Sequence, residues 1–374
     1  MLFKKRSLIV NSIILTAMFS QSVLADSYMF RSHLDGVLAN EDSGDNNNDN
    51  GEDVDNKGIW EKFADNNGLE YEDSWSTIDW DDKNITSIPD AAYPNSNPNG
   101  SLWIADNSIT NVNGFNNITS IGNDLSLDHD PLTNIDGLSN LETIGASLYM
   151  GGTTLTSLNG FSSLRTITDD AYIDGGDLKN VDGLNNLEAV GETFSLQNNE
   201  IDNVSGLSSL QLVQSDFYLN QNNLNDVDGM ESLNQVYGNF DLQNMNIKNV
   251  DGLSSLNYVG GNLSLQNNDI ENVDGLGNLE KVDVSLKLNG NNLSNVDGLS
   301  SVTKIGYNLN LQDNPNLVDL SGLRNIEEVS SIRIDSNIAN REGFTPIPSD
   351  SWLCIGANRY VFDGNYASQE DVCG

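Results

Sequence analysis

The chain has 374 residues, of which 55 are acidic and 17 are basic, and its formal net charge is −38 at pH 7. Such a charge repels phosphate backbones, so composition argues against nucleic acid as a partner and favours basic ligands, divalent cations or solubility in salt. The chain has only two histidines and two cysteines, which argues against a zinc site or a histidine- or cysteine-dependent catalytic site.

The first 25 residues have the pattern of a secretory signal peptide. Lys4, Lys5 and Arg6 precede a mostly apolar stretch at 8–19, and small residues lead up to Ala25. This order predicts export with cleavage near Ala25. An uncleaved membrane anchor is the alternative, but the apolar stretch is shorter than the roughly 20 residues that a spanning helix needs. We expect no membrane span in the mature chain.

Residues 26–57 contain an acidic low-complexity run from Glu41 to Lys57, which predicts a disordered linker. Asp45, Asn47 and Asp49 alternate as in a calcium loop, although the glycine and the final glutamate of an EF-hand are out of place. Calcium is therefore a possible ligand there, and no other cofactor is indicated.

Residues 58–77 are predicted to form an N-terminal cap. The segment from Ile59 to Leu69 has the pattern of a short amphipathic helix, and with Tyr71, Trp75 and Trp80 it would cover the open end of a repeat array.

A 23-residue repeat dominates residues 78–345. A glycine followed by an apolar residue recurs in strict register at Gly114, Gly137, Gly160, Gly183, Gly206, Gly229, Gly252, Gly275 and Gly298. Eleven and thirteen residues after each glycine stand two apolar residues, such as Leu263 and Leu265, which predicts a short strand. About twelve such strands would stack into a parallel solenoid.

Two polar columns accompany the repeat. We interpret the asparagines as structural amides that bond the backbone of adjacent coils: Asn107, Asn199, Asn222, Asn268, Asn291 and Asn314. The aspartates before the glycines would cap a short helical turn, or alternatively form a calcium-binding edge: Asp136, Asp182, Asp228, Asp251, Asp274 and Asp297.

Residues 346–374 are predicted to form a C-terminal cap. Cys354 and Cys373 lie 19 residues apart. In an exported chain they most simply form a disulfide, and metal ligation is the weaker interpretation because no histidine is near.

The repeat unit from Leu253 to Leu265 resembles those of receptor L-domains and related bacterial leucine-rich-repeat surface proteins. The resemblance covers roughly residues 78 to 340. It implies a mainly β, parallel-strand leucine-rich-repeat solenoid at the cell surface or secreted, with the periplasm as another possible location. It does not imply a particular function, because this fold serves receptors, adhesins, inhibitors and wall proteins.

The candidate binding residues face outward from the strands in the N-terminal half. They are the aromatic residues Trp103, Tyr149, Tyr172 and Tyr218 and the flanking aspartates Asp124, Asp128, Asp170, Asp174 and Asp216. Aromatic rings beside carboxylates suit a sugar or a basic protein surface, but tyrosine also favours exposed strands for its own sake. The C-terminal half carries Gln, Asn and Ser instead.

Two functions follow from this pattern, and no catalytic spacing suggests an enzyme. The first is a non-enzymatic protein that binds a glycan or protein ligand through the aromatic and acidic face. The second is a structural or adhesive spacer in the cell envelope, which calcium would stabilise.

Overall fold

The computed structural model describes residues 53–69, 77–355 and 368–374. The predicted signal peptide, the Asp45–Asn47–Asp49 motif, Tyr71 and Trp75 lie outside these residues. All described residues belong to one compact unit that spans residues 51–374.

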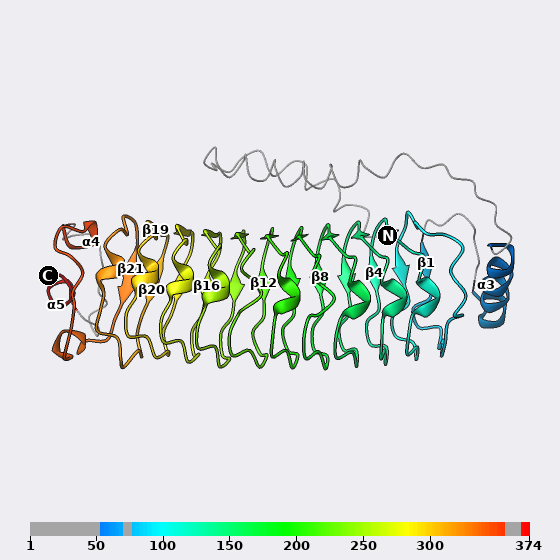
Figure 1. Ribbon diagram of the computed structural model, residues 1–374, viewed down its shortest axis with the longest axis horizontal. Coiled ribbons are helices and arrows are strands. Elements are labelled where there is room, and N and C mark those ends of the chain that lie inside the picture. The colour runs from blue at the N-terminus through cyan, green and yellow to red at the C-terminus, as the bar shows by residue number, and fades with distance from the viewer. Residues whose placement is uncertain (1–52, 70–76, 356–367) are drawn as a thin grey trace. The chain divides into compact units, whose positions relative to one another are not determined.

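The repeats form a parallel β-solenoid in which each coil contributes a short strand to a twelve-stranded sheet, here called the long sheet (Figure 1). Neighbouring strands are parallel and pair without a register slip, as in Leu263 with Leu286. The predicted fold is therefore confirmed. The strands of the long sheet are β1 (Ile78–Asp79), β2 (Leu102–Trp103), β4 (Leu125–Ser126), β6 (Leu148–Tyr149), β8 (Ala171–Tyr172), β10 (Phe194–Ser195), β12 (Phe217–Tyr218), β14 (Phe240–Asp241), β16 (Leu263–Ser264), β18 (Leu286–Lys287), β20 (Asn308–Asn310) and β21 (Ser331–Arg333).

A second parallel sheet, of nine strands, runs through the same coils and was not predicted. Each of its strands ends in a buried apolar residue, such as Val259 or Val282. Two-residue strands with one inward position have no alternation that a sequence pattern could reveal. The strands are β3 (Ser120–Ile121), β5 (Thr143–Ile144), β7 (Thr166–Ile167), β9 (Ala189–Val190), β11 (Leu212–Val213), β13 (Gln235–Val236), β15 (Tyr258–Val259), β17 (Lys281–Val282) and β19 (Lys304–Ile305).

The glycine column is explained by a close approach between coils. A Cβ atom on Gly252 would lie 1.9 Å from the carbonyl oxygen of Val227, and one on Gly298 would lie 1.7 Å from that of Val273. No side chain fits at these distances, so the repeat requires glycine there.

Short 3-10 turns are centred on these glycines in most coils. The turns are η1 (Asn113–Phe115), η2 (Asp136–Leu138), η3 (Asn159–Phe161), η4 (Ser205–Leu207), η5 (Asp251–Leu253), η6 (Asp274–Leu276), η7 (Asp297–Leu299), η8 (Ser321–Leu323) and η9 (Ile338–Asn340). The aspartates of η2, η5, η6 and η7 do not cap the turns as predicted, because each of these turns begins at the aspartate itself and no side-chain cap bond is made. The residue two positions earlier accepts the aspartate N–H instead, as Asn249 does from Asp251 at 3.1 Å.

The asparagine column bonds the coils together, as predicted. Asn199 donates through Nδ2 to the carbonyl oxygens of Ile173, in the preceding coil, and Leu196, at 2.8 and 3.0 Å. Its Oδ1 accepts the N–H of Gly176 at 3.0 Å. A buried amide that satisfies three backbone groups stabilises the stack without facing a ligand.

Helix α3 (Asp53–Asn67) covers the N-terminal end of the core. Trp60 is fully buried, stacks on Trp80 and Phe115, and donates through Nε1 to the carbonyl oxygen of Ala91. The helix begins five residues before the predicted cap, so the end of the predicted linker is helical. Acidic residues in a first turn are compatible with the helix dipole and did not prevent this.

The C-terminal cap holds α4 (Trp352–Ile355) and α5 (Gln369–Val372). The predicted disulfide between Cys354 and Cys373 joins them, with Cα atoms 5.7 Å apart. Leu353 and Val372 contribute to the core from these helices.

Candidate functional site

The outward side chains of the long sheet form one continuous column, because the strands pair in register. In spatial order the column reads Asp79, Trp103, Ser126, Tyr149, Tyr172, Ser195, Tyr218, Asp241, Ser264, Lys287, Asn310 and Arg333. Residues that are 23 or more positions apart in sequence thus become neighbours at the strand spacing of about 4.8 Å.

The four predicted aromatic residues, here called the aromatic patch, lie in the N-terminal half of this column. Trp103, Tyr149, Tyr172 and Tyr218 are all half-buried. The rings of Tyr149 and Tyr172 stack with centroids 6.0 Å apart and planes 14° from parallel. One serine separates this pair from Trp103 and another separates it from Tyr218. The structure therefore brings Tyr149 and Tyr172 into contact. It separates Trp103 and Tyr218 from that pair by one intervening strand each.

Four of the predicted aspartates also hold adjacent coils together, and Asp128 does so by accepting the N–H of Gly151. Asp124, Asp170 and Asp216 each accept the backbone N–H of the residue 23 positions later, which is Ser147, Thr193 or Asn239. The bond from Thr193 N to Asp170 Oδ1 measures 2.9 Å. One oxygen of each carboxylate is thus committed to the scaffold.

The second oxygen of Asp216 accepts the hydroxyl of Tyr218 at 2.7 Å. Burial raises the pKa of Tyr218 to about 12, and the hydrogen bond to Asp216 adds to this. The ring of Tyr218 is therefore fixed in orientation and keeps its proton at physiological pH.

Asp128 and Asp174 flank the aromatic patch on its other side. Asp128 accepts the N–H of Gly151, and burial raises the pKa of both carboxyl groups. Both are half-buried beside the patch, so their carboxylates are partly desolvated before any ligand arrives.

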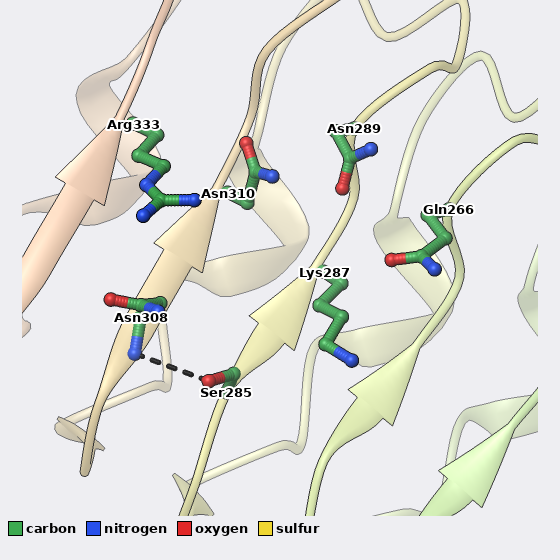
Figure 2. Close-up of a pocket in the computed structure, with 7 residues that line it drawn as sticks. All are labelled: Gln266, Ser285, Lys287, Asn289, Asn308, Asn310 and Arg333. Carbon is green, nitrogen blue, oxygen red and sulfur yellow. Dashed lines mark hydrogen bonds between the residues drawn. The ribbon is translucent and has the colours of Figure 1, made fainter.

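The C-terminal half of the face contains a pocket that sequence reasoning did not find. It has a volume of about 260 Å³, and every residue that lines it is polar or charged (Figure 2). The lining residues are Gln266, Ser285, Lys287, Asn289, Asn308, Asn310 and Arg333. Lys287 and Arg333 are two repeats apart in sequence. Extending the column of outward residues to β21 would therefore have placed the two cations near each other.

The repeat region matches the model of a known protein family. The model described as "BspA type Leucine rich repeat region" matches the chain in six copies, at residues 71–199, 103–225 and 192–317. The chain belongs to this family. No curated protein sequence matches it.

Several solved structures resemble this BspA-type protein at low sequence identity. An internalin of Listeria monocytogenes is 17% identical with a TM-score of 0.45, covering 76% of this chain and 78% of that one. Internalin C2 of the same organism is 23% identical with a TM-score of 0.36, covering 59% and 82%. A leucine-rich-repeat protein of Leptospira interrogans is 13% identical with a TM-score of 0.36, covering 77% and 92%.

Asp130 is a second feature of this BspA-type protein that sequence reasoning missed. It occupies the asparagine column, is only 1% exposed, and accepts the N–H of Asn107 through Oδ1 at 3.0 Å. Its Oδ2 has no hydrogen-bond partner in the described chain. Burial raises the pKa of Asp130 to about 7. An asparagine would donate to backbone carbonyls at this position, and a carboxyl group can do so only when protonated.

Within residues 53–69, 77–355 and 368–374, no group of three or more His, Cys, Asp or Glu side chains is arranged to hold a metal ion. The helices of that same part of the chain include none long and apolar enough to cross a membrane.

Proposed function

We propose that this protein is a non-enzymatic binding protein that recognises a glycan or protein ligand through the aromatic patch and its flanking aspartates. The observation that carries this proposal is the stacked pair of Tyr149 and Tyr172, which stays half-exposed on a continuous sheet face. Repeat solenoids use such extended faces as binding surfaces.

The chemistry of the patch suits either ligand class. A sugar ring can stack on the platform of Tyr149 and Tyr172, since aromatic side chains supply apolar area at a small entropic cost. Each neighbouring carboxylate has lone pairs left for hydroxyl groups or for a basic side chain. The net charge of −38 would draw a basic protein toward the face.

We also propose that the protein acts outside the cytoplasm, at the cell surface or secreted, after cleavage near Ala25. The disulfide between Cys354 and Cys373 supports this, because disulfides persist in oxidising compartments. Sequencing the N-terminus of the exported protein tests the cleavage site, with Asp26 as the expected first residue.

A structural or adhesive spacer stabilised by calcium is the second candidate. Asp251, Asp274 and Asp297 begin equivalent turns of consecutive coils and make no capping bond. Such a column of carboxylates repels itself, and divalent cations would relieve the repulsion. This candidate predicts that calcium raises the unfolding temperature and that the aromatic residues are irrelevant to function.

The deciding experiment is binding of residues 26–374 to a glycan array and to cell-surface proteins, with and without calcium. The test variant changes Trp103, Tyr149, Tyr172 and Tyr218 to Ala. A control variant changes Tyr237 and Tyr258 to Ala. Tyr258 belongs to β15 of the nine-stranded sheet, and Tyr237 follows β13 and packs against it. We expect the test variant, folded by circular dichroism, to lose binding at least about tenfold while the control retains it. Equal binding by all three proteins would contradict the proposal.

A further inference from the structure

The pocket in the C-terminal half of the long sheet concentrates positive charge on an acidic protein. Lys287, Asn310 and Arg333 are aligned on the neighbouring strands β18, β20 and β21. Figure 2 shows Arg333 extending from β21 toward β20, with Lys287 on the other side of Asn310. In a molecule with a net charge of −38, two cations that line one small pocket mark a place for an anionic group.

Neither cation forms a salt bridge with a carboxylate in the part of the chain that the structure describes, although the charge of Lys287 acts on Asp241 and offsets part of the rise in its pKa that burial causes. Their column neighbour Asp241 lies two strands from Lys287, and its carboxylate accepts two bonds from Gln243, at 3.1 and 2.7 Å. The two lysines of the nine-stranded sheet, by contrast, are paired: Lys281 with Asp283 at 2.8 Å and Lys304 with Glu328 at 3.0 Å.

Two atoms of the pocket lack hydrogen-bond partners among the described residues. Arg333 Nε, a donor, and Asn289 Oδ1, an acceptor, are both buried and unpaired. A buried polar group without a partner is unfavourable, so a ligand that bonds to both atoms would gain binding free energy from them. An anion alone satisfies the donor and leaves the acceptor unpaired. A ligand with both a carboxylate and hydroxyl groups satisfies both.

The remaining lining residues are suited to a sugar. The amides of Gln266, Asn289, Asn308 and Asn310 both donate and accept, as ring hydroxyls do. No aliphatic or aromatic side chain lines the pocket, so an apolar ligand gains nothing there. A volume of about 260 Å³ lies below the range for drug-sized ligands and fits a single small residue.

We propose that this pocket binds one acidic sugar residue of a glycan, such as a uronic acid, with its carboxylate on Arg333 and Lys287 and its hydroxyls on the surrounding amides. The planar guanidinium of Arg333 matches a carboxylate in two parallel hydrogen bonds, and Lys287 adds a point charge. This site stands apart from the aromatic patch, and the inference holds whether or not that patch binds a ligand. The side chain of an acidic peptide would use the cations and leave the amides unsatisfied.

The test is binding of D-glucuronate to residues 26–374 by saturation-transfer NMR and calorimetry at low salt. D-glucose supplies the ring without the carboxylate, acetate supplies the carboxylate without the ring, and a short glutamate peptide represents the protein alternative. The test variant is Lys287→Gln with Arg333→Gln. The control is Lys281→Gln with Lys304→Gln, which removes the same charge from the nine-stranded sheet.

We expect glucuronate to bind more tightly than the other three ligands, and the test variant to weaken this binding at least about tenfold. The control variant and the variant lacking the aromatic patch should bind glucuronate like the unaltered protein. Matching unfolding temperatures establish that the variants are folded. The inference is overturned if glucuronate does not bind at millimolar concentration, or if acetate, glucose or the peptide binds as tightly as glucuronate. It is also overturned if the control variant loses as much affinity for glucuronate as the test variant.

Discussion

The two halves of the long sheet's exposed face share one backbone and differ in their side chains. Tyr149 and Tyr172 stack among aspartates in the N-terminal half, whereas Lys287 and Arg333 stand among amides in the C-terminal half. The inward apolar residues continue through both halves, and the asparagine column is present in both but interrupted, as at Asp130. The repeat therefore specifies the scaffold at one set of positions and leaves the surface free to vary at another.

The largest expected effect tests whether the scaffold is the same in both halves. The two test variants are Gly137→Ala in η2, in the N-terminal half, and Gly298→Ala in η7, in the C-terminal half. They would place Cβ atoms 1.8 and 1.7 Å, respectively, from carbonyl oxygens of the preceding coil. We expect each to lower the free energy of unfolding by about 3 kcal/mol or more, measured by urea denaturation. A loss below about 1 kcal/mol in either half would show that the coils there can separate.

Asp130 gives the next effect, because it breaks the asparagine column in the N-terminal half. The folded-state pKa is raised to about 7 from 3.8, so the folded state retains a proton that the unfolded chain releases. Its contribution is fully present below pH 4 and is lost as the pH rises to about 7.

Asp130→Asn should therefore stabilise the protein by about 2 kcal/mol at pH 8, with the gain disappearing toward pH 4. Asn291→Asp should introduce the same pH dependence into the C-terminal half, since Asn291 bonds two backbone carbonyls there. Urea denaturation at several pH values measures both. A constant difference between Asp130→Asn and the unaltered protein across this range would contradict the assignment.

The smallest effect concerns the rigidity of the aromatic patch. Tyr218→Phe removes the hydrogen bond to Asp216, and we expect a loss of about 1 kcal/mol or less. In ultraviolet titration the unaltered protein should contain one tyrosine with a pKa of about 12 that is missing from the variant. If the tyrosine missing from the variant titrates at about pH 10 instead, Tyr218 is not held by Asp216.

Much of the fold could be predicted from the sequence, because it depends on positions that recur. The glycine register, the paired apolar residues of the strands and the asparagine column each report a contact that most coils repeat. The disulfide was predictable because Cys354 and Cys373 are the two cysteines of the chain. The predicted capping role of the aspartates was wrong because the turns begin one residue earlier than predicted, and the sequence pattern does not distinguish these two positions.

The candidate site was predictable only in part. The outward column placed Trp103, Tyr149, Tyr172 and Tyr218 on one face, but it could not show that Asp124, Asp170 and Asp216 bond the next coil. Those bonds depend on the direction of each carboxylate. The pocket at Arg333 was missed because seven side chains from four neighbouring coils form it together. Whether such side chains leave a space between them depends on their packing, which the sequence pattern does not show.

The central claim is that ligands bind to the exposed face of the long sheet, and side-chain footprinting tests it most directly. Hydroxyl radicals oxidise exposed aromatic rings, so oxidation of Trp103, Tyr149, Tyr172 and Tyr218 can be compared with and without the strongest ligand from the glycan array or the surface proteins. We predict that this ligand protects the aromatic patch and leaves Tyr237 and Tyr258 unchanged. Protection of Tyr237 and Tyr258 with no change in the patch would contradict the account.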